Sequence, residues 1–221
     1  MKSNIHENNF KTSNMMSKTL KLLSLVVIIL GVNSCSSDDD DNMPQFQIEA
    51  DIVANLYAPQ EGGQGTGEPE SGDFIKFDFA TGTTTTSDTD WDIAFRGTKI
   101  LVNGGVSTGL VDEPERTGNA AAYLATGELD DIDAVNTDLL EQDSVNGLVL
   151  RNWYTYAGPP THEIKPTAGK ILVIRTRSGA FAKVEILSYY QDAQPNETYT
   201  NFQYYTFNYV YNPNEGDESF E

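Results

Sequence analysis

Short segments in which apolar and polar residues alternate recur along the chain after residue 44. In the segment 73–82, Ile75, Phe77 and Phe79 alternate with other residues and so fall on one face of an extended chain. This period of two is typical of a strand with one buried face. Eleven Tyr and ten Phe add to the preference, because aromatic residues are enriched in strands. We therefore expect a mainly antiparallel β domain, sandwich- or barrel-like, with minor short helices.

Turn and loop signals divide these segments into strands. Arg96-Gly97-Thr98 is expected to turn the chain between two strands, and Ser178-Gly179 to turn a hairpin. Residues 58–72, rich in Gly, Pro and Glu, predict a loop. The expected strands are residues 45–57, 73–82, 91–95, 99–103, 148–158 and 162–166, then the hairpin 169–191 and the strand 197–212.

The stretch 89–105 carries no obvious nucleophile, metal cluster or phosphate loop, and it is interpreted as scaffold. Trp91, Ile93 and Phe95 are predicted to share one face, with Trp91 anchoring the core. Gly104-Gly105 accommodates a positive φ or a close backbone approach. It is expected to lead into a long loop that would cover a ligand.

Residues 106–146 are predicted to form a long excursion, and such loops are usually functional or mobile. Within it, 117–125 is expected to make a short helix, and 128–144, with seven acidic residues, to contain short helical pieces. The acidic run lacks the glycine of a calcium-binding EF-hand loop. The carboxylates interpreted as a solvated acidic loop are Asp130, Asp131, Asp133 and Asp138.

The N-terminal segment has the charged, apolar and small-residue order of a secretory signal. Lys18 and Lys21 precede the apolar run 22–32. Its eleven residues are too few to span a bilayer as a helix, for which about 20 are needed. Translation is expected to start at Met15 or Met16, because the residues before them are polar.

Residues 1–34 are therefore predicted to be a signal peptide, followed by the single cysteine, Cys35. The sequence Val32-Asn33-Ser34-Cys35 resembles a bacterial lipobox, so Cys35 is predicted to carry a lipid anchor. The linker 35–44 contains four aspartates in a row, which stay solvated and resemble the surface-export tag of Bacteroidetes lipoproteins. Residues 45–221 are the predicted β domain. The expected location is the outer membrane, exposed at the cell surface and held through the lipid only.

Charge and motifs exclude several classes of function. The formal net charge is −19 at pH 7 and the isoelectric point is about 4.2, without a basic stripe that could neutralise a phosphate backbone. Nucleic acid is therefore not expected as a partner. No nucleophile-elbow, zinc-protease, phosphate-loop or dinucleotide motif occurs, so the chain is not expected to be an enzyme.

Three segments together resemble the HmuY family of haem-binding outer-membrane lipoproteins from Bacteroidetes. They are TDWDIAF with the N-G-G turn that follows, KILVIRTRSGAFAKVEILSYY and TFNYVY, all behind a lipobox. The resemblance covers roughly residues 74–211. It implies an all-β protein that captures haem from host or competitor proteins and delivers it to a TonB-dependent receptor. In the founding type two loop histidines hold the iron, and relatives use methionine.

Those ligand types are missing where the resemblance would place them. Residues 104–152 contain neither His nor Met, and Tyr154 and Tyr156 stand where the second ligand is expected. His162 is the single histidine of the predicted domain, so bis-His coordination within one chain is excluded. A tyrosinate can ligate ferric haem when a neighbouring base or cation favours it, and Arg151 and His162 are close in sequence.

The candidate haem ligands are therefore Tyr154, Tyr156 and His162. Each also has a structural interpretation, as a buried tyrosine with a bonded hydroxyl or a strand histidine bonded to a neighbour. Haem could also be held by aromatic stacking alone. The first hypothesis is a non-catalytic surface lipoprotein that binds haem or a related porphyrin for iron acquisition. The alternative is a module that has lost haem ligation and serves structure, adhesion or another ligand.

Overall fold

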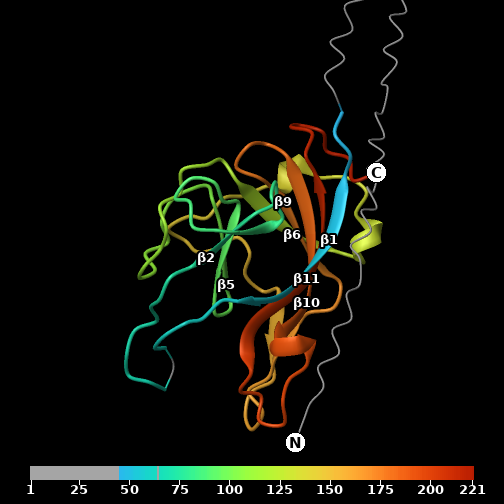
Figure 1. The fold of residues 1–221 in the computed structure, drawn as a ribbon. Helices are drawn as coiled ribbons and strands as arrows, with labels where there is room; N and C mark the ends of the chain where they lie inside the picture. The colour runs from blue at the N-terminus through green and yellow to red at the C-terminus, as the bar shows by residue number, and fades with distance from the viewer. Residues whose placement is uncertain (1–44, 64) are drawn as a thin grey trace, which may run out of the picture. The chain divides into compact units, whose positions relative to one another are not determined.

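The computed structural model describes residues 45–63 and 65–221, so the predicted signal 1–34 and Cys35 lie outside the described residues. In this part of the chain strands dominate and helix is limited to three 3-10 turns, which confirms the mainly antiparallel β class (Figure 1). The strands are β1 (Glu49–Tyr57), β2 (Ile75–Asp78), β3 (Thr83–Thr85), β4 (Ile93–Arg96), β5 (Lys99–Val102), β6 (Ala121–Thr126), β7 (Tyr154–Tyr156), β8 (Ile164–Pro166), β9 (Lys170–Arg175), β10 (Phe181–Tyr190) and β11 (Phe202–Asn212). The 3-10 turns are η1 (Leu129–Asp131), η2 (Thr137–Leu139) and η3 (Gln191–Ala193).

Two sheets and one small hairpin make up the domain. The larger sheet has five strands in the order β1-β11-β10-β9-β6, and the smaller has four in the order β3-β2-β4-β5. β7 and β8 form a separate two-stranded hairpin. All of these neighbouring strands run antiparallel. The turn predicted at Ser178-Gly179 joins β9 to β10, and the turn predicted at Arg96-Gly97-Thr98 joins β4 to β5.

An aromatic core joins the inner faces of the two sheets. Phe77 and Phe95 of the four-stranded sheet contact Phe207 and Tyr205 of β11. The ring centroids are 5.6 Å apart for Phe77 and Phe207, and 4.7 Å for Phe95 and Tyr205. All four side chains are fully buried, and rings packed at these distances stabilise a core beyond their area alone. Since neither sheet closes on itself, the fold is a sandwich rather than a barrel.

A second apolar cluster covers the outer face of the five-stranded sheet. Val135 and Phe220 pack there against Phe181 of β10. The acidic segment therefore folds over the sheet, and the short helical pieces predicted within it are η1 and η2. Lys183 of β10 donates hydrogen bonds to the carbonyl oxygens of Leu129 and Ile132, at 2.8 and 3.0 Å. These bonds attach the segment to the sheet below it.

The short helix predicted for residues 117–125 is wrong. Ala121–Thr126 form β6, which pairs with β9 at the edge of the five-stranded sheet. Alanine favours a helix in isolation. Here Ala121 and Ala122 are buried, and pairing with β9 satisfies the backbone groups of the segment, so tertiary packing overrides the local preference.

The predicted face of Trp91 is also wrong, although the side chain is fully buried as expected of a core residue. The chain bends at Asp92 before β4 begins, so the alternation of Ile93 and Phe95 does not extend back to Trp91. Ile93 and Phe95 face the core between the sheets. Trp91 packs instead on the other face of the four-stranded sheet, with Phe74, Ala94 and Leu101.

The described residues belong to one compact unit, Met43–Glu221. None of its helical segments has the length and apolar character needed to cross a membrane. Across residues 45–63 and 65–221 there is also no group of three or more His, Cys, Asp or Glu side chains that could hold a metal ion. Asp130, Asp131, Asp133 and Asp138 are all exposed, as expected of a solvated acidic loop.

Candidate functional site

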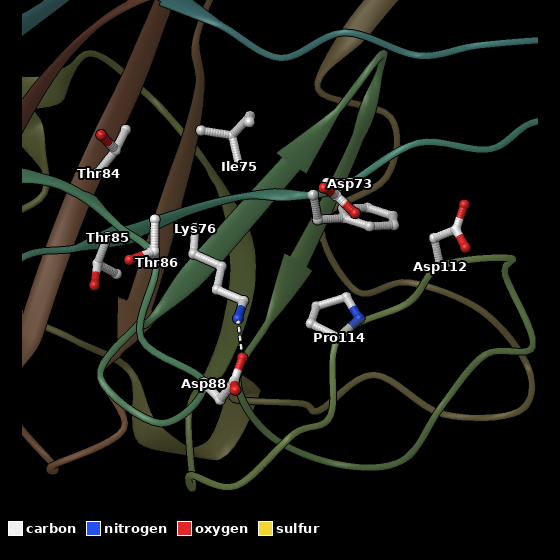
Figure 2. Close-up of a pocket in the computed structure, with 10 residues that line it drawn as sticks. Asp73, Ile75, Lys76, Thr84, Thr85, Thr86, Asp88, Asp112 and Pro114 are labelled. Atoms are coloured by element: carbon white, nitrogen blue, oxygen red, sulfur yellow. Dashed lines mark hydrogen bonds and ion pairs between the residues drawn. The ribbon is translucent and has the colours of Figure 1, made fainter.

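Two hollows of similar size open on the described domain, and their linings distinguish them. The first, of about 500 Å³, lies along β2 and β3 (Figure 2). Its polar groups are Thr84–Thr86, Asp73, Asp112 and the ammonium of Lys76, which Asp88 pairs at 2.8 Å. These groups offer hydroxyl and carboxylate oxygens and an already paired lysine. The lining residues include no His, Met or Tyr that could ligate iron.

The second hollow, of about 510 Å³, lies where three parts of the chain meet. These parts are the loop 58–72, the turn between β4 and β5, and the β7–β8 hairpin together with the ends of β10 and β11 that adjoin η3. Its lining side chains form two groups, an aromatic wall and a polar wall. The aromatic wall consists of Tyr189, Tyr190, Tyr199, Phe202, His162 and Ile164. The polar wall consists of Gln60, Thr66 and Glu70.

The β7–β8 hairpin pairs two of the predicted ligands. Tyr156 is the last residue of β7, and His162 lies in the turn that returns the chain to β8. The hydroxyl of Tyr156 is hydrogen-bonded to Nδ1 of His162, and the ring centroids are 5.8 Å apart. His162 has a positive φ of 54°, and its backbone N–H donates to the carbonyl of Gly158 at 2.8 Å. The turn thus presents the imidazole both to Tyr156 and to the hollow.

The hairpin is attached to the main sheet through Tyr190. Its hydroxyl accepts a hydrogen bond from the backbone N–H of Ile164 at 2.9 Å. At the base of the hairpin the N–H of Thr167 donates to the carbonyl of Trp153, also at 2.9 Å. Trp153 is buried in the main core. The hairpin is therefore held at its base and along β8.

Tyr154 does not join the other two candidates. It packs beside Trp153, with ring centroids 5.0 Å apart, and is partly buried against the main core. Of the three candidates His162 lines the hollow, whereas Tyr154 and Tyr156 are not among its lining residues. The structure therefore brings Tyr156 and His162 together and separates Tyr154 from them. Arg151, the cation close to them in sequence, lines a different surface hollow beside β6.

Two lining tyrosines are suited to form a wall rather than to bind iron. Burial raises the pKa of Tyr189 far above its ordinary value, and burial also raises the pKa of Tyr190. Both side chains are almost completely buried. Their phenols therefore stay protonated at neutral pH and present aromatic surface to the hollow. Tyr189 is also stacked on Phe202, with ring centroids 6.5 Å apart.

The turn between β4 and β5 lines the hollow and is held in place by hydrogen bonds from buried side chains. The buried hydroxyl of Tyr205 donates to the carbonyl of Gly97 at 2.8 Å. The indole Nε1 of Trp153 donates to the carbonyl of Thr98 at 3.1 Å. The loop 58–72 reaches this turn, because the N–H of Gly97 donates to the carbonyl of Ala58 at 2.9 Å.

Sequence reasoning identified His162 and its partner but missed most of the lining. Neither the aromatic wall nor the polar wall was predicted. The one available signal was the pair Tyr189-Tyr190 at the end of the hairpin 169–191, where two adjacent aromatics interrupt the alternation. Nothing in the sequence places residues 60–70 beside that pair.

The HmuY protein family model matches residues 70–204. A Tannerella forsythia apo HmuY analog is similar with 13% identity and a TM-score of 0.45, over 77% of this chain and 100% of that one. A Bacteroides vulgatus structure described as HmuY-like and heme-binding has 14% identity and a TM-score of 0.44, over 76% and 96%.

Apo PinO from Porphyromonas gingivitis has 15% identity and a TM-score of 0.41, over 76% of this chain and 98% of that one. No curated protein matches the chain. With identities and TM-scores this low, the structural likenesses do not contribute to the family assignment. It rests on the family model, which covers more than half of the sequence. The chain belongs to the HmuY family.

Proposed function

We propose that this protein binds haem or a related porphyrin, without catalysis, in the hollow between the β7–β8 hairpin and the loop 58–72. The observation that carries the proposal is His162, which lines a hollow that has an aromatic wall and is hydrogen-bonded to Tyr156. Family membership supports the same class of function. The first hollow, along β2 and β3, offers neither feature.

The size and lining of the hollow fit a flat, largely apolar guest. Its volume of about 510 Å³ falls in the range of about 300 to 1,000 Å³ typical of small-molecule sites. Tyr189, Tyr190, Tyr199 and Phe202 provide uncharged aromatic surface on which a macrocycle can stack. The site lies on loops and strand ends, where binding residues are usually found.

Tyr156 and His162 fit ferric iron better than either residue would alone. When bound, the iron of haem supplies a Lewis-acid centre that accepts an oxygen or nitrogen donor. In the tautomer whose Nδ1 carries no proton, His162 would accept the phenol proton of Tyr156, and the phenolate oxygen would then be the donor to the iron. Tyr156 is half exposed, so its oxygen is accessible to a guest. Tyr154, the third candidate, would act only through its packing on Trp153.

The proposal includes the location and partners inferred from the sequence. Cys35 would carry the lipid that anchors the domain to the outer membrane, with the acidic linker 35–44 directing it to the cell surface. The domain would take haem from host haem proteins and transfer it to a TonB-dependent receptor. Nucleic acid would have no part in this function, because the chain is strongly acidic.

Titration of the purified domain with hemin tests the proposal. We expect saturable binding and a shifted Soret band, and we expect Tyr156→Phe and His162→Ala each to weaken binding by about tenfold and to change the spectrum. Tyr154→Phe is the matched control, because it removes the same hydroxyl two residues away and should leave both readouts unchanged. Absence of saturable binding by the unaltered domain would contradict the proposal and favour the structural, adhesive or other-ligand alternative.

A further inference from the structure

The lining of the second hollow contains no cation to receive a carboxylate. Its described side chains include Glu70 but no Lys or Arg, and the aromatic wall offers no compensating charge. A carboxylate left without a partner beside aromatic rings is unfavourable, because it loses water and gains nothing in return. Haem carries carboxylates on one edge of an otherwise apolar ring. A cation just behind the polar wall would give these carboxylates a partner.

Lys99 is the cation that meets this requirement. It is the first residue of β5, and its Nζ is paired with the carboxylate of Glu70 and lies 3.5 Å from Oε1 of Gln60. Glu70 and Gln60 both line the hollow. The ammonium is thus one contact behind the polar wall.

Arg96 lies close by but is not available to a guest. It is the last residue of β4 and pairs in register with Lys99, yet its side chain is completely buried. Its Nη1 already donates to the carbonyls of Gly72 and Val111, at 2.9 and 2.6 Å, and its guanidinium stacks on Phe74 at 4.1 Å. Lys99 therefore remains the accessible positive charge on this side of the hollow.

We propose that Lys99 is the counter-ion for a carboxylate of the bound macrocycle, and that Glu70 occupies this position until the guest carboxylate displaces it. This inference rests on the proposed function, since it assigns a carboxylated porphyrin to the same hollow. Glu70 is suited to the exchange, because its side chain is 38% exposed and can turn into solvent. Exchange of one carboxylate for another keeps Lys99 paired throughout, and partly exposed pairs such as this one contribute little to stability.

The experiment compares hemin with hemin dimethyl ester, in which both carboxylates are converted to uncharged methyl esters. Glu70→Gln removes the competing carboxylate and should tighten hemin binding by about fivefold, whereas Lys99→Met should weaken it by about tenfold. Neither substitution should change binding of the ester by more than about twofold. Lys99→Arg keeps the charge and should retain hemin affinity.

Lys165→Met serves as the control, because Lys165 is an exposed lysine on β8 that does not line the hollow. Thermal unfolding of each variant without a guest checks that the domain remains folded. If hemin binds and Lys99→Met leaves its affinity unchanged, or if the two guests respond equally, the counter-ion role is overturned while the proposed function stands. If the unaltered domain binds neither guest, the proposed function fails as well.

Discussion

A single carboxylate, that of Glu113, organises the beginning of the long excursion. It accepts hydrogen bonds from the hydroxyl of Ser107 at 2.6 Å and from the backbone N–H groups of Thr108 and Gly109, each at about 3.1 Å, and it pairs with Arg116. Burial alone would raise the pKa of Glu113. The hydrogen bonds from Ser107, Thr108 and Arg116, with the charge of Arg116, outweigh burial and lower the pKa to about 2.

Substitution of this carboxylate should therefore destabilise the domain in a pH-dependent way. Glu113→Gln leaves Arg116 short of one charged partner and should reduce the free energy of unfolding by about 3 kcal/mol at pH 7. The folded pKa of about 2 lies below the ordinary value of 4.5, so the contribution of Glu113 is fully present above pH 4.5 and is lost as the pH falls toward 2. Urea unfolding at pH 7 and pH 2.5 measures the difference.

Glu115→Gln is the matched control, because Glu115 lies in the same loop and is exposed. It should change the free energy of unfolding by less than about 0.5 kcal/mol at either pH. An equal loss for Glu113→Gln at pH 2.5 and at pH 7 would show that the effect comes from altered packing rather than from the charge.

At the residue scale, the candidate site was predictable only where its members are close in sequence. Tyr156 and His162 are six residues apart and meet within one hairpin, so a search of neighbouring residues finds them. Lys99 and Glu70 are 29 residues apart and belong to different segments. Their contact depends on how the loop 58–72 packs against the turn between β4 and β5. The alternation of apolar and polar residues contains no information about that packing.

At the scale of elements, alternation predicted the strands that have one buried face and one mixed face. The hairpin 169–191 was predicted with its turn, because charged residues alternate with apolar ones along β10. β6 was missed because its alanines carry no amphipathic signal and favour a helix when considered alone. Its pairing with β9 decides its conformation, and that pairing joins segments that are far apart in sequence.

The segment directly after β5 depends on a glycine, Gly105, that has no space for a side chain. Gly105 has a φ of 82°, and an added Cβ would lie 2.0 Å from the carbonyl oxygen of Asp143. That carbonyl accepts a hydrogen bond from the N–H of Val106 at 3.0 Å, so it cannot move freely. Gly105→Ala should therefore cost at least about 3 kcal/mol of unfolding free energy, from clash and backbone strain together.

Gly109 provides a control for the backbone strain. It has nearly the same φ, 85°, but an added Cβ would have no atom within 4 Å. Gly109→Ala should cost only about 1 kcal/mol, the strain of a left-handed alanine. Thermal or urea unfolding of both variants measures the difference, and equal losses would contradict the role assigned to the contact with Asp143.

At the scale of the whole molecule, the charge of the chain opposes capture of an anionic guest. The net charge of −19 repels hemin at long range, whereas Lys99 acts only at contact. Raising the ionic strength from about 0.01 M to about 0.15 M shortens the Debye length from about 30 Å to about 8 Å. The association rate of hemin, measured by stopped-flow absorbance, should therefore increase with salt.

Hemin dimethyl ester provides the comparison, since it carries no carboxylate to be repelled. Its association rate should stay nearly constant over the same range of salt. A hemin association rate that falls with salt would mean that local attraction, rather than the charge of the whole domain, governs the encounter.

The position of β11 between β1 and β10 determines the order in which the domain can assemble. Glu49 of β1 pairs with Tyr211, so the two halves of this contact are separated by nearly the entire domain. A chain synthesised from its N-terminus must therefore expose β1 without its partner until β11 has emerged. Pairings between such distant segments form slowly. Chaperone capture would have its longest opportunity in that interval.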